Sequence, residues 1–308
     1  MKGLFEALLA RLSQGRSVAL VSVVQSSGSA PRGPGARMLV DENGWAFGTV
    51  GGGKVEHEST LQARELVHKE GFFLRDFALR NREAGDLGMA CGGDMRIFFQ
   101  HIGPDQMDFC RLGLAKIAAG ETAYWVTDTQ TGAMELTAVE PGEGRYFAQR
   151  ISGGGRSYVF GGGHVAQVLV PLLAKADFQP VVLEDRAEFA DPALFPDASE
   201  VRLVDFSRLE GLGVSAGDDV VIITRGHLHD QAVLFQMLKT PAGYVGMIGS
   251  RAKRGLVYAY LLENGFSQED ISRVHSPIGL PIQAETPFEI AVSIAAEMIK
   301  CRAERKER

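Results

Sequence analysis

Short runs of apolar and β-branched residues, separated by turn residues, dominate the first half of the chain and predict the strands of a mixed α+β domain. The clearest run is Ser17 to Gln25, and the turn residues Asp41 to Gly44 predict a hairpin shortly after it. Apolar residues at helical spacing predict helices at 1–15, 55–70 and 105–119. The strands predicted in this half lie at 17–25, 38–40, 45–50, 72–79, 95–100, 122–128 and 134–139.

In the second half, strand patterns alternate with helical patterns, which is typical of a parallel sheet with helices on its faces. Residues 141–155 have the glycine content of a linker, so we place a domain boundary near residue 150. The predicted fold class is α/β, with a mixed α+β N-terminal domain over 1–150 and a Rossmann-like, doubly wound, mostly parallel sheet over 151–308. The strands predicted in this sheet lie at 158–160, 180–183, 201–206, 220–224, 243–248 and 273–275.

A glycine turn follows the first of these strands, with Gly161, Gly163 and Ala166 in the spacing G-x-G-x-x-A. In a dinucleotide-binding βαβ unit the first glycine allows a tight turn, and the second lets backbone N–H groups approach a phosphate. About twenty residues later Glu184 and Asp185 close the next strand, where such a unit places its ribose-binding acid. The structural alternative is a turn that only packs. The candidate binding residues here are Gly161, Gly163, His164 and Asp185.

The strand predicted at 220–224 ends in a polar loop, at the sheet edge where ligands bind in open α/β folds. Its residues Arg225, His227 and His229 can hydrogen-bond a polar ligand, while helix capping by Asp230 is the structural alternative. A metal ion would need a third ligand that this pattern does not provide, so we predict no metal site.

The strand predicted at 243–248 is followed by Ser250, Arg251, Lys253 and Arg254. Cations beside a serine at the start of a helix suit a phosphate. Basic residues are equally common on solvated helix faces, so the two interpretations stay open. We take Ser250 and Arg251 as candidate binding residues.

In the first domain, Gly48 to Lys54 satisfies the G-x-x-x-x-G-K part of a P-loop, but Val55 stands where the Mg²⁺-binding Ser or Thr would be. Nucleotide hydrolysis is therefore not expected. A strand-to-helix turn of this kind still predicts an anion cradle made of backbone N–H groups. The candidate residues of this cradle are Gly51, Gly52, Gly53 and Lys54.

Two further loops of this domain are rich in glycine. The loop at 26–38 carries Arg32 and Arg37 as its charges and predicts an anion grip, with a solvated connection as the alternative. The loop at 80–94 carries Cys91 beside two glycines, which leaves its thiol open to chemistry, although free cysteines commonly pack as small buried residues. Arg32 and Cys91 are the candidates from these loops.

Composition excludes several classes of function. The net charge is −6 and no basic stripe stands out, so a nucleic-acid partner is not expected. No apolar stretch reaches the length of about 20 residues that a membrane span requires. The three cysteines are isolated and predict neither a disulfide framework nor a C-x-x-C pair, which favours a cytoplasmic protein.

Seven stretches of this sequence, in order, resemble the XdhC/CoxI family of accessory proteins for molybdenum hydroxylases. They include GSAPRGPGARM, GTVGGGKVE, ACGGD, YVFGGGHVA and TRGHLHD, and they span both predicted domains. One departure is Gln283, where the family pattern has glycine. The stretches lie at 28–38, 48–56, 90–94, 158–166, 224–230, 244–254 and 275–294.

The resemblance implies a protein that binds molybdenum cofactor, a molybdopterin that carries a phosphate or a nucleotide. It further implies sulfuration of the cofactor, with a cysteine desulfurase as the sulfur source, and delivery to an apo molybdenum hydroxylase such as xanthine dehydrogenase. Homodimers are expected, and turnover of a small substrate is not. In this light Cys91 becomes a candidate Mo ligand or sulfur relay.

Two other functions fit the glycine turn and the acids after it. One is an NAD(P)-dependent oxidoreductase, for which His227 or His229 would have to serve as the acid or base. The other is a nucleotide-sensing regulatory module, in which the Rossmann unit binds the ligand and the first domain contacts a partner. Retained pterin, or nicotinamide bound with or without turnover, would distinguish the three.

Overall fold

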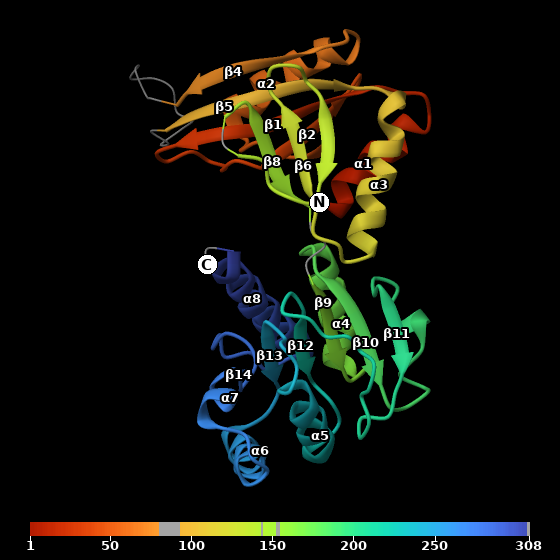
Figure 1. Ribbon diagram of the computed structural model, residues 1–308, viewed down its shortest axis with the longest axis vertical. Helices are drawn as coiled ribbons and strands as arrows, with labels where there is room; N and C mark the ends of the chain where they lie inside the picture. Colours follow the sequence, from red (N-terminus) through yellow and green to blue (C-terminus); the bar gives the residue numbers. More distant parts are fainter. Residues whose placement is uncertain (80–92, 143, 152–154, 307–308) are drawn as a thin grey trace. The chain divides into compact units, whose positions relative to one another are not determined.

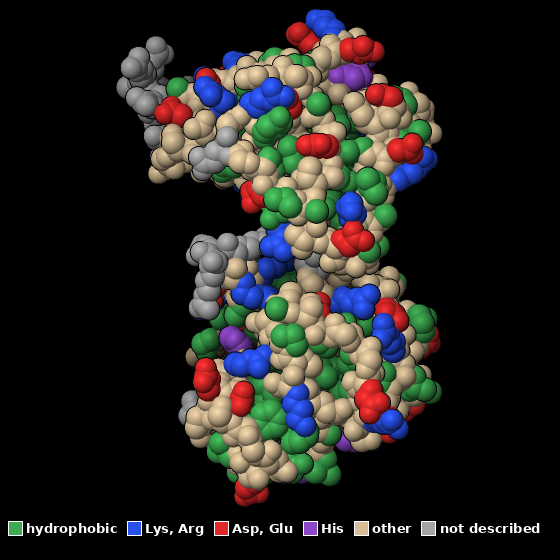
Figure 2. All heavy atoms as spheres, in the orientation of Figure 1, with side chains coloured by type: hydrophobic (Ala, Val, Ile, Leu, Met, Phe, Trp, Pro, Cys, Tyr) green, Lys and Arg blue, Asp and Glu red, His purple; other side chains and the backbone are tan. Residues whose placement is uncertain are grey.

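The computed structural model describes residues 1–79, 93–142, 144–151 and 155–306 (Figure 1). The chain forms two compact units, Met1–Ser152 and Gly153–Arg308. On the face drawn in Figure 2, basic and acidic side chains are interspersed over each unit. Within the described ranges, no helix is both long enough and apolar enough to cross a membrane.

The main sheet of the first unit is antiparallel and has five strands in the order β3-β2-β1-β5-β4. The first six residues of β1 are buried, as expected for a central strand with side chains packed on both faces. Helix α2 (Gly53–Val67) covers one face, and α1 (Lys2–Leu12) and α3 (Met107–Ala118) cover the other. The strands are β1 (Val18–Ser27), β2 (Arg37–Asp41), β3 (Gly44–Gly48), β4 (Phe72–Ala78) and β5 (Asp94–Ile102).

A second, three-stranded antiparallel sheet, in the order β7-β6-β8, completes this unit. It comprises β6 (Tyr124–Asp128), β7 (Met134–Thr137) and β8 (Tyr146–Arg150), and a 3-10 turn at Pro104–Gln106 precedes α3. The prediction of a linker over 141–155 is wrong for β8, because its backbone pairs with β6 along its whole length. Pairing with a distant strand is a tertiary interaction that local glycine content does not report.

The second unit contains a six-stranded parallel sheet in the order β11-β10-β9-β12-β13-β14. Counted along the chain this is the order 3-2-1-4-5-6 of a Rossmann fold, and the predicted fold class is confirmed. The strands are β9 (Arg156–Phe160), β10 (Gln179–Glu184), β11 (Glu200–Leu203), β12 (Asp219–Ile222), β13 (Tyr244–Met247) and β14 (Val274–His275). A 3-10 turn at Pro192–Leu194 lies between β10 and β11.

Helices cover both faces of this sheet. Alternation along β9 sends Tyr158 and Phe160 into a core with α5 and α6, and sends Val159 into a core with α4 and α8. The helices are α4 (His164–Lys175), α5 (His227–Met237), α6 (Arg251–Glu263), α7 (Gln268–Ser272) and α8 (Pro287–Lys306). Helix α8 begins with a capping box, in which Glu289 and Thr286 exchange hydrogen bonds of 2.9 and 3.3 Å.

Candidate functional site

The glycine turn between β9 and α4 forms the centre of the Rossmann edge. Gly161 has φ +109°, and a Cβ there would lie 2.6 Å from the carbonyl oxygen of Ile223, so the fold itself requires glycine. The fold does not require glycine at position 163, because the φ of Gly163 is −71° and a Cβ there would meet nothing within 4 Å. Among the described residues no group accepts a hydrogen bond from the N–H of Gly163 or His164. The N-terminus of α4 is therefore open to an anion.

This contrast gives a matched pair of variants. We expect Gly163→Ala to lower the free energy of unfolding by no more than about 1 kcal/mol, since alanine fits this backbone although it is a poorer N-cap residue than glycine. The methyl group would nevertheless hinder a phosphate from approaching the N–H groups, so the affinity for an anionic ligand should fall. Gly161→Ala should lower stability by about 2 kcal/mol through backbone strain. Chemical unfolding and ligand titration of both variants check this, and equal effects would contradict it.

The two acids after β10 have different roles, which their sequence positions did not separate. The Glu184 side chain is 1% exposed, and its carboxylate accepts hydrogen bonds from the N–H of Gly162 at 2.6 Å and from Arg186 Nε at 2.9 Å. Burial alone would raise its pKa, but these hydrogen bonds outweigh that effect and lower the pKa to about 2. Glu184 thus closes the glycine turn internally, whereas Asp185 is partly exposed.

Asp185 and His229, both predicted site residues, lie side by side. His229 Nδ1 is 3.1 Å from Asp185 Oδ2, which is ion-pair distance, although the geometry does not meet that of a hydrogen bond. Burial and the neighbouring carboxylate of Glu184 raise the pKa of Asp185. Because β9 lies between β10 and β12 in the sheet, this contact brings together the loops on either side of the glycine turn.

The rest of the loop after β12 is partly structural. Arg225 and His227 are exposed, as a ligand-contacting role requires. Asp230 is fully buried and does not cap α5, whose N-cap is Gly226; its carboxylate accepts hydrogen bonds from the backbone N–H and the hydroxyl of Thr224 and from Lys253. Burial raises the pKa of Asp230, and the bonds from Lys253 and Thr224 oppose that shift.

The loop after β13 offers less to a phosphate than its sequence indicates. The Ser250 hydroxyl caps α6 by accepting a hydrogen bond from the N–H of Lys253 at 3.3 Å, and Arg251 is the first residue of that helix. Lys253 is engaged by Asp230, and Arg254 donates to the carbonyl of Ser276 at 2.8 Å. Both cations therefore serve the fold.

A half-buried carboxylate also anchors the loop after β14. Glu297 of α8 accepts hydrogen bonds from the Tyr244 hydroxyl at 2.6 Å and from the N–H of Gly279 at 2.9 Å, and it lies 3.4 Å from His275 Nδ1. Burial opposes ionisation, but the contacts with His275 and Tyr244 lower the pKa of Glu297. Sequence reasoning missed this role, because Glu297 sits in an ordinary amphipathic helix.

In the first unit, three of the resembling stretches meet at one end of the main sheet. A Cβ at Gly51 would lie 2.7 Å from the ring of Pro31, and a Cβ at Gly93 would clash with the backbone of Ser27. The exposed Arg32 lies beside Gly51, since a Cβ at Gly51 would be 3.6 Å from the Cγ of Arg32. Cys91 lies outside the described residues, so its role stays a prediction.

The glycine turn before α2 is already occupied by a carboxylate of the chain. Glu56 Oε2 accepts hydrogen bonds of 3.2 Å from the N–H groups of Val50 and Gly52, and another from the hydroxyl of Thr49. The predicted anion cradle at Gly51, Gly52, Gly53 and Lys54 thus holds an internal anion, while Gly53 and Lys54 are exposed at its rim.

Removing this carboxylate should expose the cradle. We expect Glu56→Ala to lower the free energy of unfolding of the first unit by about 1–2 kcal/mol in chloride buffer, because several donors lose their acceptor. Inorganic phosphate should restore part of the loss, since the freed N–H groups face an anion. Urea unfolding with tryptophan fluorescence measures both effects, as Trp45 and Trp125 lie in this unit. A loss that phosphate leaves unchanged would show that the turn does not bind anions.

Arg37, at the start of β2, is a buried charge with no hydrogen-bond partner in the part of the chain that the structure describes. Its side chain is 7% exposed, and none of its three guanidinium nitrogens has a hydrogen-bond partner among the described residues. Its Cζ lies 3.8 Å from the ring centroid of Trp125, a cation–π contact that contributes about 2 kcal/mol when desolvated. Desolvation of an ion costs several kcal/mol, more than this contact returns. Burial accordingly lowers the pKa of Arg37 to about 9, and it remains charged at neutral pH.

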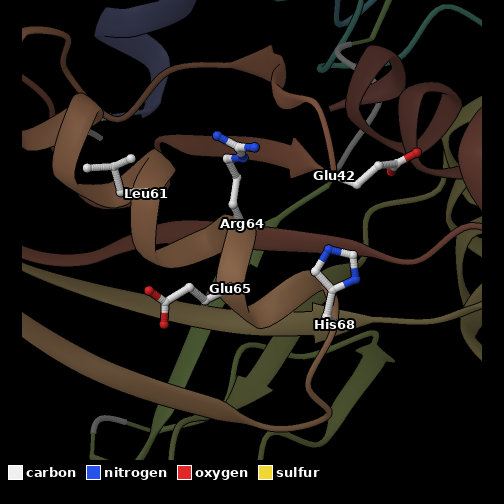
Figure 3. Close-up of a pocket in the computed structure, with 5 residues that line it drawn as sticks. All are labelled: Glu42, Leu61, Arg64, Glu65 and His68. Carbon is white, nitrogen blue, oxygen red and sulfur yellow. The ribbon is translucent and has the colours of Figure 1, made fainter.

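A surface pocket of about 310 Å³ lies elsewhere, between the outer face of α2 and the turn after β2 (Figure 3). Its lining is mostly exposed and charged, and it contains none of the predicted site residues. We therefore do not place the functional site there. The described residues also contain no group of three or more His, Cys, Asp or Glu side chains positioned to hold a metal ion.

The strand order and the glycine turn that leads from β9 into α4 define the second unit as a Rossmann-type domain. Residues 158–298 match the XdhC Rossmann domain, and residues 11–78 match the XdhC and CoxI family. These two matches together cover more than half of the chain, which belongs to the XdhC and CoxI family.

The individual relatives share between 24% and 28% of their aligned residues with this chain. The protein named YqeB from Escherichia coli K12 is 28% identical over 92% of this chain, which spans 43% of that relative's length. A protein of Bacillus subtilis 168, named as a probable subunit of xanthine dehydrogenase, is 26% identical, with 97% of this chain and 98% of the relative aligned. The "Molybdenum cofactor insertion chaperone PaoD" of E. coli K12 is 24% identical, with 96% and 87% aligned.

A solved structure has the same fold. The crystal structure of a xanthine dehydrogenase from Bacillus halodurans superposes with a TM-score of 0.82 at 24% identity, and the match covers 98% of this chain and 96% of that one. The architecture described above therefore extends over nearly the whole of both chains.

Proposed function

We propose that this protein is an accessory factor that binds molybdenum cofactor, supports its sulfuration and delivers it to a molybdenum hydroxylase such as xanthine dehydrogenase. Membership of the XdhC and CoxI family supports this proposal, as do the names of two relatives, a molybdenum cofactor insertion chaperone and a probable subunit of xanthine dehydrogenase. The single structural observation that carries it is the open N-terminus of α4 at Gly163, beside the Asp185–His229 pair.

In this proposal the Rossmann edge holds the phosphate or nucleotide part of the cofactor. The N–H groups of Gly163 and His164 would bind phosphate oxygens, and the partly exposed Asp185 would accept hydrogen bonds from hydroxyl groups. Arg225 and His227 are exposed at the same edge and supply further donors. The residues present thus suit an anionic, hydroxyl-bearing ligand.

We assign the sulfur chemistry to Cys91, which belongs to the resembling stretch ACGGD of the first half of the chain. Cys91 would ligate Mo or relay sulfur that a cysteine desulfurase supplies, because a thiolate binds soft metals and exchanges sulfur readily. We expect a cytoplasmic homodimer that hands the cofactor to the apo hydroxylase.

The decisive experiment is to identify the ligand that the protein retains when it is purified without oxygen from a host that makes the cofactor. Acid oxidation with pterin fluorescence and metal analysis should find pterin and Mo in amounts near that of the protomer. Gly163→Ala should retain less pterin, while the exposed Arg111→Ala, on α3 of the other unit, should retain the wild-type amount. Retention of NAD(P) without pterin would overturn the proposal in favour of a dehydrogenase or a sensor.

The role of Cys91 is tested separately. We expect Cys91→Ala to lose most of its ability to activate an apo hydroxylase, while Cys301→Ala, a matched change on α8, keeps it. Activation is measured as hydroxylase turnover after incubation with loaded protein. If Cys91→Ala binds cofactor and activates fully, sulfur does not pass through this residue.

A further inference from the structure

The unpaired charge of Arg37 sits between the two sheets of the first unit. Successive residues of β2 alternate between two cores, so Arg37 shares a face with Leu39, which packs against the core that contains Trp125. The guanidinium lies over the Trp125 ring, and its Cζ is 5.9 Å from the ring centroid of Phe147 on β8. Phe5 stacks on Trp125 with its ring centroid at 5.1 Å. Aromatic rings thus surround the charge, and none of them neutralises it.

Other polar groups near Arg37 are unsatisfied as well. The indole Nε1 of Trp125 is buried and has no hydrogen-bond partner among the described residues, and the same holds for Gln149 Oε1 on the neighbouring strand. The donors exceed the acceptors, since Arg37 and Trp125 can only donate. A cluster of buried donors that includes a guanidinium charged at neutral pH is suited to an anion.

The carboxylates on the same strands are already paired. Asp41, at the end of β2, is contacted by Arg11 and Arg16, and Asp128, at the end of β6, is contacted by Arg145. Buried water can satisfy N–H groups but leaves the charge in place. Neither of these carboxylates is therefore free to neutralise Arg37.

The location of Arg37 suggests where an anion would enter. Arg37 begins β2 and pairs with Ser22 on β1, and the next residue, Met38, pairs with Gly48 on β3. Arg37 therefore lies at the sheet end where the glycine-rich stretches meet. The loop at 28–36 covers this end and is held by a 3.0 Å hydrogen bond from Gln149 Nε2 to the carbonyl of Gly35.

We propose that Arg37 is a buried receptor for a phosphate-type oxyanion, either a free ion or the phosphate group of a larger ligand, and that the loop at 28–36 moves aside to admit it. The guanidinium fork binds two oxygens of the anion, and the Trp125 indole donates to a third. The receptor is distinct from the Rossmann edge and does not depend on which ligand that edge binds, so the two assignments can fail separately.

Thermal unfolding of the full chain tests the receptor, with tryptophan fluorescence as the probe of the first unit. Buffers of equal ionic strength contain chloride, inorganic phosphate or glycerol 3-phosphate. We expect phosphate to raise the wild-type midpoint saturably, by about 5 °C at a hundredfold excess over the dissociation constant. Arg37→Met should show no such rise and should match or exceed the wild type in chloride, because it removes an uncompensated charge. Arg96→Met, which changes an exposed arginine of the same main sheet, should respond as the wild type does.

Phosphorus NMR line broadening on the wild type and on Arg37→Lys gives a second measurement in case Arg37→Met does not fold. Broadening in the wild type that is strongly reduced in Arg37→Lys supports the receptor, since lysine keeps the charge but loses the planar fork. Stabilisation by both phosphates assigns the site to a phosphate group on a larger ligand, and stabilisation by inorganic phosphate alone assigns it to a free ion. Equal wild-type midpoints in chloride and both phosphates, or an unchanged response in Arg37→Met, would overturn the proposal.

Discussion

Replacing Asp230 with asparagine is expected to lower the free energy of unfolding of the second unit by about 3 kcal/mol or more. The carboxylate is fully buried, and it joins the end of β12, through Thr224, to Lys253 on α6. An amide of the same shape leaves Lys253 partly buried without its counter-charge, which is the costly half of a broken buried ion pair. Both tryptophans lie in the other unit, so tryptophan fluorescence does not report on the unfolding of this one. Hydrogen exchange of the backbone amides of residues 219–263 measures the loss of stability instead.

The double variant Asp230→Asn with Lys253→Met supplies the control. It removes the unpaired charge together with its partner, so a large part of the lost stability should return. A double variant as unstable as Asp230→Asn alone would show that the hydrogen bonds to Thr224 matter more than the ion pair. Unchanged protection in the single variant would contradict the proposed role of Asp230.

The second large effect concerns acid stability and Glu184. Its pKa in the folded protein is about 2, against 4.5 for the ordinary side chain, so its ionised form contributes about 3 kcal/mol of stability. Because the folded pKa is depressed, this contribution is present above pH 4.5 and is lost as the pH falls from 4.5 towards 2. We expect Glu184→Gln to be less stable than the wild type by about 3 kcal/mol at pH 7.

The difference between the two proteins should shrink as the pH falls below 4.5, since the wild-type carboxylate then takes up a proton. Urea unfolding followed by circular dichroism at several pH values measures it. Glu188→Gln, at an exposed position four residues along the same loop, should behave as the wild type throughout. A difference between Glu184→Gln and the wild type that stays constant from pH 7 to pH 3 would exclude the charge of Glu184 as its cause.

The glycine turns show how far sequence spacing can be taken. The spacing predicted the position of the turn at Gly161 and Gly163, because the geometry of a strand, a tight turn and a helix start is local. It did not show that the similar turn at Gly51 to Gly53 is filled by Glu56, which reaches back along its own helix. Nor did it show that Glu184, the first of two adjacent acids, closes the glycine turn from the neighbouring strand.

The sequence by itself determined the alternation of strands and helices, the doubly wound class of the second unit, the resemblance to the XdhC/CoxI family and the loops that carry the candidate site residues. These features follow from periodicity and from residues close together in the chain. Only the tertiary structure placed Asp185 beside His229 and buried Asp230 against Lys253. It also left Arg37 without a hydrogen-bond partner among the described residues. Each of these depends on which side chains from distant segments fill the space around a charge. The free energy of a buried charge is set by that surrounding space, and no local pattern in the chain encodes it.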